Sequence, residues 1–352
     1  MRNAARGPIA WRSELWGSPL RAVATLLLLA LFAWIGFHVV EWGVVHAVFR
    51  PDAEACRAVQ HGACWGVVAE KWRPMLFGRF PYEEQWRPAV AVIVLSAVTM
   101  LSAWPRSWRW WLVPLWVVAL LLFVLLMRGG VLGLSHVPTG RWGGLPLTIG
   151  LAVVGLALAF PLALLLALGR RSGWPVVRTL SASYIELVRG VPLISVLFMA
   201  SFLLPLLWPA GWQPDVLVRV LAGLALFVAA YLAEIIRGGL QSLPKGQFEA
   251  ADAMGLNYFQ KTTLIILPQA LRVVIPPLIN TFIGFFKDTS LVLIIGIFDF
   301  LNAANQALVD PNWAGYPSEV YLFAAFVYFC FCFSMSRYSK YLEIELNKGT
   351  RR

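Results

Sequence analysis

The side chains in this sequence that could do chemistry are ionisable residues within apolar segments, where a charge is costly and usually functional. Two pairs of opposite charge are spaced three residues apart, so that each pair can lie on one face of a helix: Glu186 with Arg189, and Glu234 with Arg237. Both pairs fall near one end of an apolar segment, where an arginine can extend to the membrane interface. The spacing predicts ion pairs between helices, and direct contact with a ligand is the alternative.

A third polar group, Lys287-Asp288-Thr289-Ser290, lies well inside an apolar segment of about 24 residues that starts at Val274. Its distance from Val274 places Lys287 near the middle of a bilayer, a depth at which binding sites are common. Neighbouring residues on a helix point about 100° apart, so Lys287 and Asp288 cannot both face one ligand. Either one of them faces a polar pathway, or they form a buried structural pair. Pro276-Pro277 is expected to bend this helix.

The long polar stretch Gly238–Val273 reads as two short helices separated by a glycine. Gly255 suits the left-handed position that ends a helix, because it has no Cβ. On the helix before it, small residues beside Glu249 let another surface approach closely, and the carboxylate offers a directional partner to Arg or Lys. The pattern is typical of a protruding helix that docks into a groove of another protein. An amphipathic helix lying on lipid headgroups is the alternative.

These residues are embedded in a strongly apolar chain. Of its 352 residues, 59% are hydrophobic and 13% are charged, whereas soluble domains average about 45–50% and about 25%. The composition excludes a soluble enzyme, a disordered protein and a disulfide scaffold. It indicates an all-α polytopic membrane protein, because each spanning backbone must satisfy its own hydrogen bonds. About eight transmembrane helices are expected, over residues 22–48, 89–105, 110–127, 146–168, 190–208, 216–236, 274–297 and 319–336.

The distribution of the formal net charge, +11, predicts the topology. An even number of spans places both termini on one side, and Lys and Arg are about twice as frequent in the segments on that side as in the others. Both termini are therefore expected in the cytoplasm. The expected membrane topology explains the excess of positive charge. The sequence contains no long run of basic residues that would indicate binding to nucleic acid.

The chain divides near residue 140 into an N-terminal extension and a core. The extension, residues 1–140, has three expected spans and an outer loop at about 49–88; the core, residues 141–345, has five spans and the inner loop at about 238–273. Cys56 and Cys64 lie eight residues apart in the outer loop. They form a disulfide if that loop faces an oxidising compartment, and otherwise they remain free thiols.

The inner loop carries the residues of a family signature. Glu249-Ala250-Ala251, three residues, Gly255, nine residues and Ile265-x-Leu267-Pro268 resembles the EAA motif of ABC importer permeases at every fixed position. Further stretches are similar to the histidine- and glutamine-permease-like family of polar amino-acid permeases: Ile185–Ile194, Ala233–Leu240, Pro268–Arg272 and Lys287–Leu291. The long N-terminal half looks like that of the M-type subunit of general L-amino-acid ABC transporters.

This resemblance implies a type I importer (MetI-like) fold for the C-terminal five helices, and a permease subunit that imports L-amino acids across a bacterial inner membrane. In the family the inner loop forms a coupling helix that inserts into the cytoplasmic ATPase. Glu249, Ala250, Ala251 and Gly255 are therefore expected to transmit motion without touching substrate. The ion pairs would lie near the inner gate, Lys287 to Ser290 along the substrate pathway, and the outer loop in the periplasm.

The resemblance also implies the partners, namely a homologous Q-type permease subunit, two ATP-binding subunits and a periplasmic amino-acid-binding protein. No Gly-x-x-x-x-Gly-Lys-[Ser/Thr] motif occurs, so ATP and Mg²⁺ are expected on the ATPase and no cofactor on this chain. The histidines, His38, His46, His61 and His136, show no ligand spacing, and neither a metal site nor a catalytic residue is expected. Two other functions stay open: an ion-coupled secondary transporter, and a non-translocating assembly subunit beside a homologous pore-lining permease.

Overall fold

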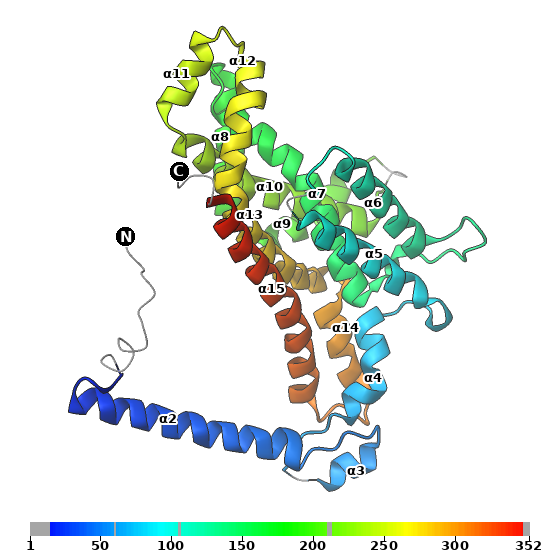
Figure 1. Ribbon diagram of the computed structural model, residues 1–352. Coiled ribbons are helices and arrows are strands. Elements are labelled where there is room, and N and C mark those ends of the chain that lie inside the picture. The colour runs from blue at the N-terminus through cyan, green and yellow to red at the C-terminus, as the bar shows by residue number, and fades with distance from the viewer. Residues whose placement is uncertain (1–14, 60, 105–106, 210–212, 348–352) are drawn as a thin grey trace.

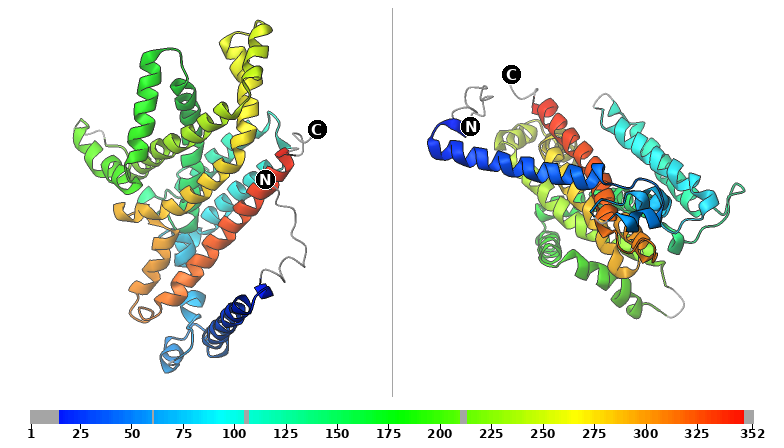
Figure 2. Two further views of the ribbon diagram at one scale, coloured as in Figure 1. Left: turned by 90° about the vertical axis from the view of Figure 1, so that its left-hand side faces the viewer. Right: turned by 90° about the horizontal axis from the view of Figure 1, so that it is seen from below.

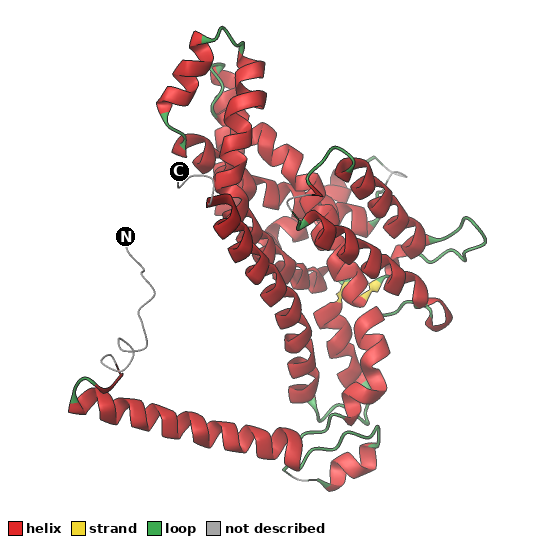
Figure 3. Cartoon of the chain, in the orientation of Figure 1, coloured by secondary structure: helices red, strands yellow, loops and turns green. Residues whose placement is uncertain are grey.

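The computed structural model describes residues 15–59, 61–104, 107–209 and 213–347, and most of them are helical (Figures 1 and 3). A two-residue strand, β1 (Phe298–Asp299), accompanies the helices. The α-helices are α2 (Pro19–Val40), α3 (Ala53–Ala58), α4 (Gly66–Phe77), α5 (Trp86–Ser102), α6 (Leu112–Arg128), α7 (Gly144–Arg170), α8 (Pro175–Gly190), α9 (Leu193–Phe198), α10 (Val216–Ser242), α11 (Lys245–Ala253), α12 (Tyr258–Gln260), α13 (Leu267–Asp288), α14 (Phe300–Gln306) and α15 (Pro317–Asn347). The π- and 3-10-helical turns that matter below are η5 (Met199–Leu203), η6 (Leu204–Leu207), η7 (Lys261–Ile266) and η8 (Thr289–Ile295).

The expected class, an all-α polytopic membrane protein, is confirmed. Within the described residues, six helical segments are long and apolar enough to cross a membrane: Pro19–Val45, Tyr82–Ser102, Gly144–Arg170, Val216–Ser242, Tyr258–Ile295 and Pro317–Glu345. The expected count of about eight is not confirmed. Residues 110–127 fall on α6, a helix of 17 residues. A helix of that length reaches roughly 26 Å, less than the roughly 30 Å of a hydrocarbon core.

The expected span at residues 190–208 falls on a broken helix. Its segments α9, η5 and η6 follow α8 at an angle of 105°, so the bent pair makes one further span at most. Pro192 accounts for the break, since a residue that precedes a proline avoids the helical region. Val191 is accordingly extended, with φ −105° and ψ 136°.

The contact between α7 and α10 forms the centre of the fold. Alanines at four-residue spacing on α7, Ala159, Ala163 and Ala167, are fully buried, and α10 contributes Ala229 and Ala233. Small residues let helix backbones approach closely, which is a usual basis of helix association in membranes. α13 packs on α10, and α15 packs on α13 (Figure 2).

α13 is continuous with the turns on either side of it. With α12, η7 and η8 it forms one apolar segment, Tyr258–Ile295. Pro276 and Pro277 lie inside α13, but they introduce no break above 40°. The helix therefore continues through both prolines, and the predicted bend, if smaller than 40°, stays a prediction. Lys287 and Asp288 are the last two residues of α13, immediately before the chain tightens into η8.

The two ends of the bundle differ in structure. α11 and α12 protrude at one end, called here the α11 end, whereas α3, α4 and α14 gather at the opposite, α14 end (Figure 1). α2 lies across the α14 end, and none of its residues is buried. Because α2 is apolar on every side, lipid or another chain must cover it in the assembled protein.

Residues 46–79, called here the cap, pack on α14 and α15 through a second apolar core. This core includes Cys56, Cys64, Val67 and Met75 of the cap and Phe300, Ala304, Ala307, Trp313, Val320 and Ala324 of the C-terminal part. The backbone N–H of Cys64 donates to the buried carboxylate of Glu319 at 2.7 Å, and Arg57 donates to Asn312 at 2.9 Å. The cap is thus attached to the C-terminal part of the chain by contacts between residues 255 positions apart.

Cys56 and Cys64 are joined by a disulfide within the cap, with their Cα atoms 5.5 Å apart, whereas Cys330 and Cys332 are free. Closing so short a loop contributes about 2–3 kcal/mol of stability in the chain-entropy model. For protein purified without reductant, alkylation under denaturing conditions followed by peptide mass spectrometry is expected to modify Cys330 and Cys332 only. Alkylation of Cys56 and Cys64 in that experiment would show that the cap holds free thiols.

Arg87 is fully buried in α5 and joins α5 to α6 and the loop that follows it. Its Nε donates to the carbonyl of Leu126 at 2.7 Å, and its Nη1 donates to the carbonyl of Ser135 at 3.0 Å and to the carboxylate of Glu84. Arg87→Lys keeps the charge but loses the fixed fork of donors. It is expected to lower the free energy of unfolding by about 2 kcal/mol. Arg50→Lys, at an exposed position, is the matched control. Equal unfolding temperatures of the two variants would show that the hydrogen bonds of Arg87 do not stabilise the fold.

Candidate functional site

The loop between α10 and α13 folds into a helical hairpin at the α11 end (Figure 1). α10 ends at Ser242, and Pro244 precedes α11 with φ −58° and ψ 138°. Gly255 has φ +71°, the left-handed conformation predicted for it, and reverses the chain after α11. Asn257 and Gln260 then form a capping box at the start of α12. The expected order of helix, glycine and helix is confirmed.

Polar contacts hold the two arms of this hairpin together. The Nζ atom of Lys261 lies 2.5 Å from the Oδ1 atom of Asp252. The Nε2 atom of Gln269 donates to the Oε1 atom of Gln247 at 3.0 Å. Ala251 is buried, on the side of α11 that packs against η7. These contacts fix α11 relative to the segment that continues into α13, so the hairpin is a braced unit.

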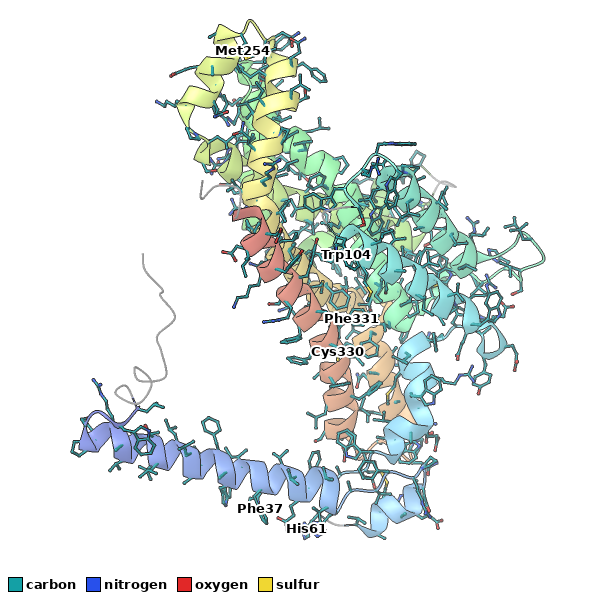
Figure 4. The ribbon with its side chains drawn as sticks, in the orientation of Figure 1. Phe37, His61, Trp104, Met254, Cys330 and Phe331 are labelled. Carbon is teal, nitrogen blue, oxygen red and sulfur yellow. A yellow bond between two sulfur atoms is a disulfide. The ribbon has the colours of Figure 1, made fainter. Side chains whose placement is uncertain are left out.

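The outer face of the hairpin presents exposed side chains. Glu249 and Ala250 are exposed, and within the described residues Glu249 makes no hydrogen bond or ion pair. Met254 is 73% exposed at the tip (Figure 4). The residues predicted for coupling therefore divide: Glu249, Ala250 and Gly255 face outward, whereas Ala251 packs inside the hairpin.

Arg171, one residue beyond α7, connects the hairpin to the core. Its Nη1 atom donates to the carbonyl of Leu240 in α10 at 2.9 Å. Its guanidinium carbon also lies 5.3 Å from the centre of the Phe248 ring in α11. The sequence gives no signal for this contact, because Leu240 lies 69 residues away along the chain. Any movement of α11 relative to α7 must change the position of Phe248 against Arg171.

Five charged side chains from α7, α8 and α10 form an ion cluster beside Arg171, comprising Arg170, Glu186, Arg189, Glu234 and Arg237. Glu234 is at its centre: its carboxylate lies 2.5 Å from Arg237, 3.2 Å from Arg170 and 3.9 Å from Arg189. Glu186 lies 2.8 Å from Arg170, and this places it beside Arg170 instead of Arg189. The guanidinium of Arg189 lies over the Tyr231 ring at 5.5 Å. The cluster links three helices near the hairpin.

A cavity of about 300 Å³ lies between α9, α10 and α13. Asp288, Tyr231 and Thr281 supply polar groups to its lining, and Gly284 leaves its wall without a side chain. Apolar side chains form the remainder. A mostly apolar cavity with a few convergent polar groups is typical of small-molecule binding sites.

Among the four residues predicted for the pathway, Asp288 lines this cavity, and the other three do not. Lys287 is exposed. The hydroxyl of Thr289 donates to the carbonyl of Phe286, and that of Ser290 to the carbonyl of Lys287, each at 2.9 Å. The structure thus separates Lys287 from Asp288, as expected for neighbours on a helix.

Three histidines that are scattered in the sequence lie around one cavity. His38, His46 and His61 line a space of about 570 Å³ together with Glu41, where α2 meets the cap. Figure 4 labels His61 in the cap and Phe37 on α2. Within the described part of the chain, no group of three or more His, Cys, Asp or Glu side chains could hold a metal ion.

The class of protein defined by the described residues is a bundle of membrane helices with an exposed helical hairpin at one end. Residues 159–347 match the family model of the binding-protein-dependent transport system inner membrane component. The inner membrane amino-acid ABC transporter permease protein YhdY of Escherichia coli K12 is 44% identical, over 99% of this chain and 95% of its own length. The glutamate/glutamine/aspartate/asparagine transport system permease protein BztC of Rhodobacter capsulatus is 37% identical, over 98% and 95%. The chain belongs to this family of inner membrane transport components.

A solved structure supports the same assignment for the core. A crystal structure of an amino acid ABC transporter with histidines is 29% identical and covers 58% of this chain and 92% of that chain, with a TM-score of 0.51. The chain is therefore a multi-pass inner membrane permease subunit and not an enzyme. The cap and the α5–α6 hairpin precede residue 159, where the family match begins.

Proposed function

We propose that this chain is a membrane-spanning permease subunit that imports L-amino acids, driven by ATP hydrolysis on a separate chain. The braced hairpin that exposes Glu249 and Met254 carries this proposal, because an ion-coupled secondary transporter has no use for such a docking element. The names of the relatives YhdY and BztC support amino acids as the substrate class.

The proposed complex contains a homologous Q-type permease subunit, two ATP-binding subunits and a periplasmic amino-acid-binding protein. In this complex α11 docks in the ATPase, so the α11 end and both termini lie in the cytoplasm and the cap lies in the periplasm. A disulfide in the cap is consistent with that side, because disulfides persist in the bacterial periplasm. Residues 1–140 then form an extension on a permease core of residues 141–345.

The contacts of Arg170 and Arg171 suggest how movement passes from the ATPase to the spans. A displacement of α11 acts on Arg171 through Phe248 and on α10 through Leu240. The neighbouring Arg170 binds both Glu186 and Glu234, so α8 and α10 are linked to the same point of α7. The ion cluster is proposed as part of the inner gate, where three arginines around Glu234 allow helices to shift without leaving its carboxylate unpaired.

Asp288 is proposed to face the ammonium group of the amino acid in the pathway. Asp288→Asn removes the charge at nearly constant size, and it is expected to lower uptake about tenfold or more, since a hydrogen bond to a charged group is lost. Lys287→Met, at a neighbouring residue outside the cavity, is the matched control. Both variants should assemble normally. Uptake that is unchanged in both would favour the alternative of an assembly subunit beside a pore-lining permease.

Purification of the tagged chain from its native membrane tests the composition of the complex. We expect the second permease chain and the ATP-binding subunits to co-purify in a stoichiometry that mass spectrometry can measure. Bound small molecules released from the complex should include amino acids. A chain that purifies without an ATPase, yet still transports after reconstitution, would overturn the proposal in favour of a secondary transporter.

A further inference from the structure

A second cavity, of about 280 Å³, opens at the α14 end between the cap and the core. Lys71 and Arg79 lie on the wall formed by the cap, and Phe298, Gln306 and Asp310 lie on the wall formed by the core. Its volume is near the lower end of the roughly 300–1,000 Å³ typical of small-molecule sites. In contrast to the cavity at Asp288, this one brings two cationic side chains to its lining.

Arg79 is held in place without an ionic partner. Its guanidinium carbon lies 3.6 Å from the centre of the Phe298 ring, so the ring covers one face of the group. Within the described residues, no carboxylate pairs with Arg79. Stacking on a ring leaves the N–H groups at the edge of the guanidinium free, and these are the donors that bind a carboxylate in a bidentate manner.

The other cation of the lining, Lys71, already has anionic partners. Lys71 lies 2.8 Å from both Asp310 and Glu70. The hydrogen bond from Lys71 lowers the pKa of the Asp310 carboxyl, and the bonds to Asp310 and Glu70 raise the pKa of Lys71. Lys71 and Asp310 therefore stay ionised and paired at neutral pH. Arg79 is left as the cation of this lining that has no counter-charge among the described residues.

The backbone around the cavity is tightly fixed. Gly78 has φ +61°, and a Cβ at this position would lie 2.7 Å from the Cα atom of Gly143, which no side chain can satisfy. Gly143 in turn forms a parallel β-bridge with Phe298. Three segments, from the cap, the start of α7 and β1, thus meet beside Arg79 and hold its ring partner in position.

We propose that this cavity is a carboxylate-binding site at the α14 end, with Arg79 as its anchor. The inference rests on the proposed import function, which places this end in the periplasm. The carboxylate belongs either to a free amino acid or to an acidic side chain of the substrate-binding component. The cap residues that line the site precede residue 159, where the family match begins. The site is therefore formed jointly by the N-terminal extension and by residues of the matched region.

The test uses the complete complex in lipid nanodiscs and compares Arg79→Gln with Arg50→Gln, which removes the same charge from an exposed arginine of the cap. One arm measures binding of L-glutamate and L-glutamine by saturation-transfer NMR. The other measures the affinity of the purified binding protein for the complex by biolayer interferometry. Arg79→Gln is expected to weaken one of these two interactions about tenfold or more, whereas Arg50→Gln leaves both unchanged.

The interaction that Arg79→Gln weakens identifies the source of the carboxylate: the free amino acid or the binding protein. If Arg79→Gln and Arg50→Gln match the parent complex in both arms, the inference is wrong. If Arg79→Gln fails to assemble, Arg79→Lys replaces it: the charge remains but the planar fork is lost, so the same arm should still weaken measurably. Uptake by the parent complex is measured in parallel. A parent that imports no amino acid with ATP contradicts the proposed function, whereas a parent that does so with two unresponsive arms contradicts this inference alone.

Discussion

Replacing Glu249 with arginine is expected to reduce ATP-driven amino-acid uptake about a hundredfold, because a like charge placed in a docking surface costs several kcal/mol. Glu249 is exposed and makes no polar contact within the described residues, so the substitution should leave the fold intact. Under the proposed function, its effect arises at the interface with the ATPase. We expect the ATPase activity of the reconstituted complex to lose its stimulation by the liganded binding protein.

The control for this substitution is Glu343→Arg, which reverses the charge of another exposed carboxylate on α15. Uptake by this variant should stay within about twofold of the parent, as for most surface substitutions. Glu249→Gln, which removes the charge without reversing it, should give an intermediate loss. Normal uptake and normal ATPase stimulation in Glu249→Arg would show that α11 does not couple the two activities.

Replacing Glu234 with glutamine is expected to lower the free energy of unfolding by about 2 kcal/mol. Removing one member of a buried ion pair typically costs about 3–5 kcal/mol, but the side chain of Glu234 is 24% exposed, and solvent screening reduces the effect. The substitution leaves Arg170, Arg189 and Arg237 without their shared carboxylate. Thermal unfolding of the purified complex measures the change.

Glu186→Gln is the matched control for the ion cluster. The side chain of Glu186 is 66% exposed and, among the residues that the structure describes, pairs with Arg170 alone, so its loss should change the free energy of unfolding by about 0.5 kcal/mol or less. We therefore expect Glu234→Gln to lower the free energy of unfolding clearly more than Glu186→Gln does. Equal destabilisation by Glu234→Gln and Glu186→Gln would mean that Glu234 is not the centre of the cluster.

The hairpin could be predicted in detail from the sequence because its determinants are local. Gly255 ends one helix, Asn257 begins the next, and Glu249 lies between small residues, all within a few positions. Apolar composition likewise predicts membrane helices. Hydropathy alone does not predict that the chain turns by 105° between α8 and α9. The bend depends on the backbone preference of Val191, the residue before Pro192.

Contacts between distant segments account for what the sequence could not show. The spacing of Glu186 and Arg189 predicts ion pairs between helices but not the partner of Glu186, which is Arg170 on α7 at 2.8 Å. The cap gives a similar example, since Cys64 and Glu319 are 255 residues apart. Spacing within one helix indicates which side chains can meet, whereas the packing of helices decides which of them do.

The proposed function is the import of amino acids by this chain, using ATP that a partner hydrolyses. The most direct measurement is uptake of a mixture of labelled L-amino acids into proteoliposomes that contain the complete complex. We predict uptake only with ATP on the side of α11 and binding protein on the side of the cap, and with no dependence on ionophores that collapse ion gradients. Uptake that continues without ATP and stops when the gradients are collapsed would contradict the claim.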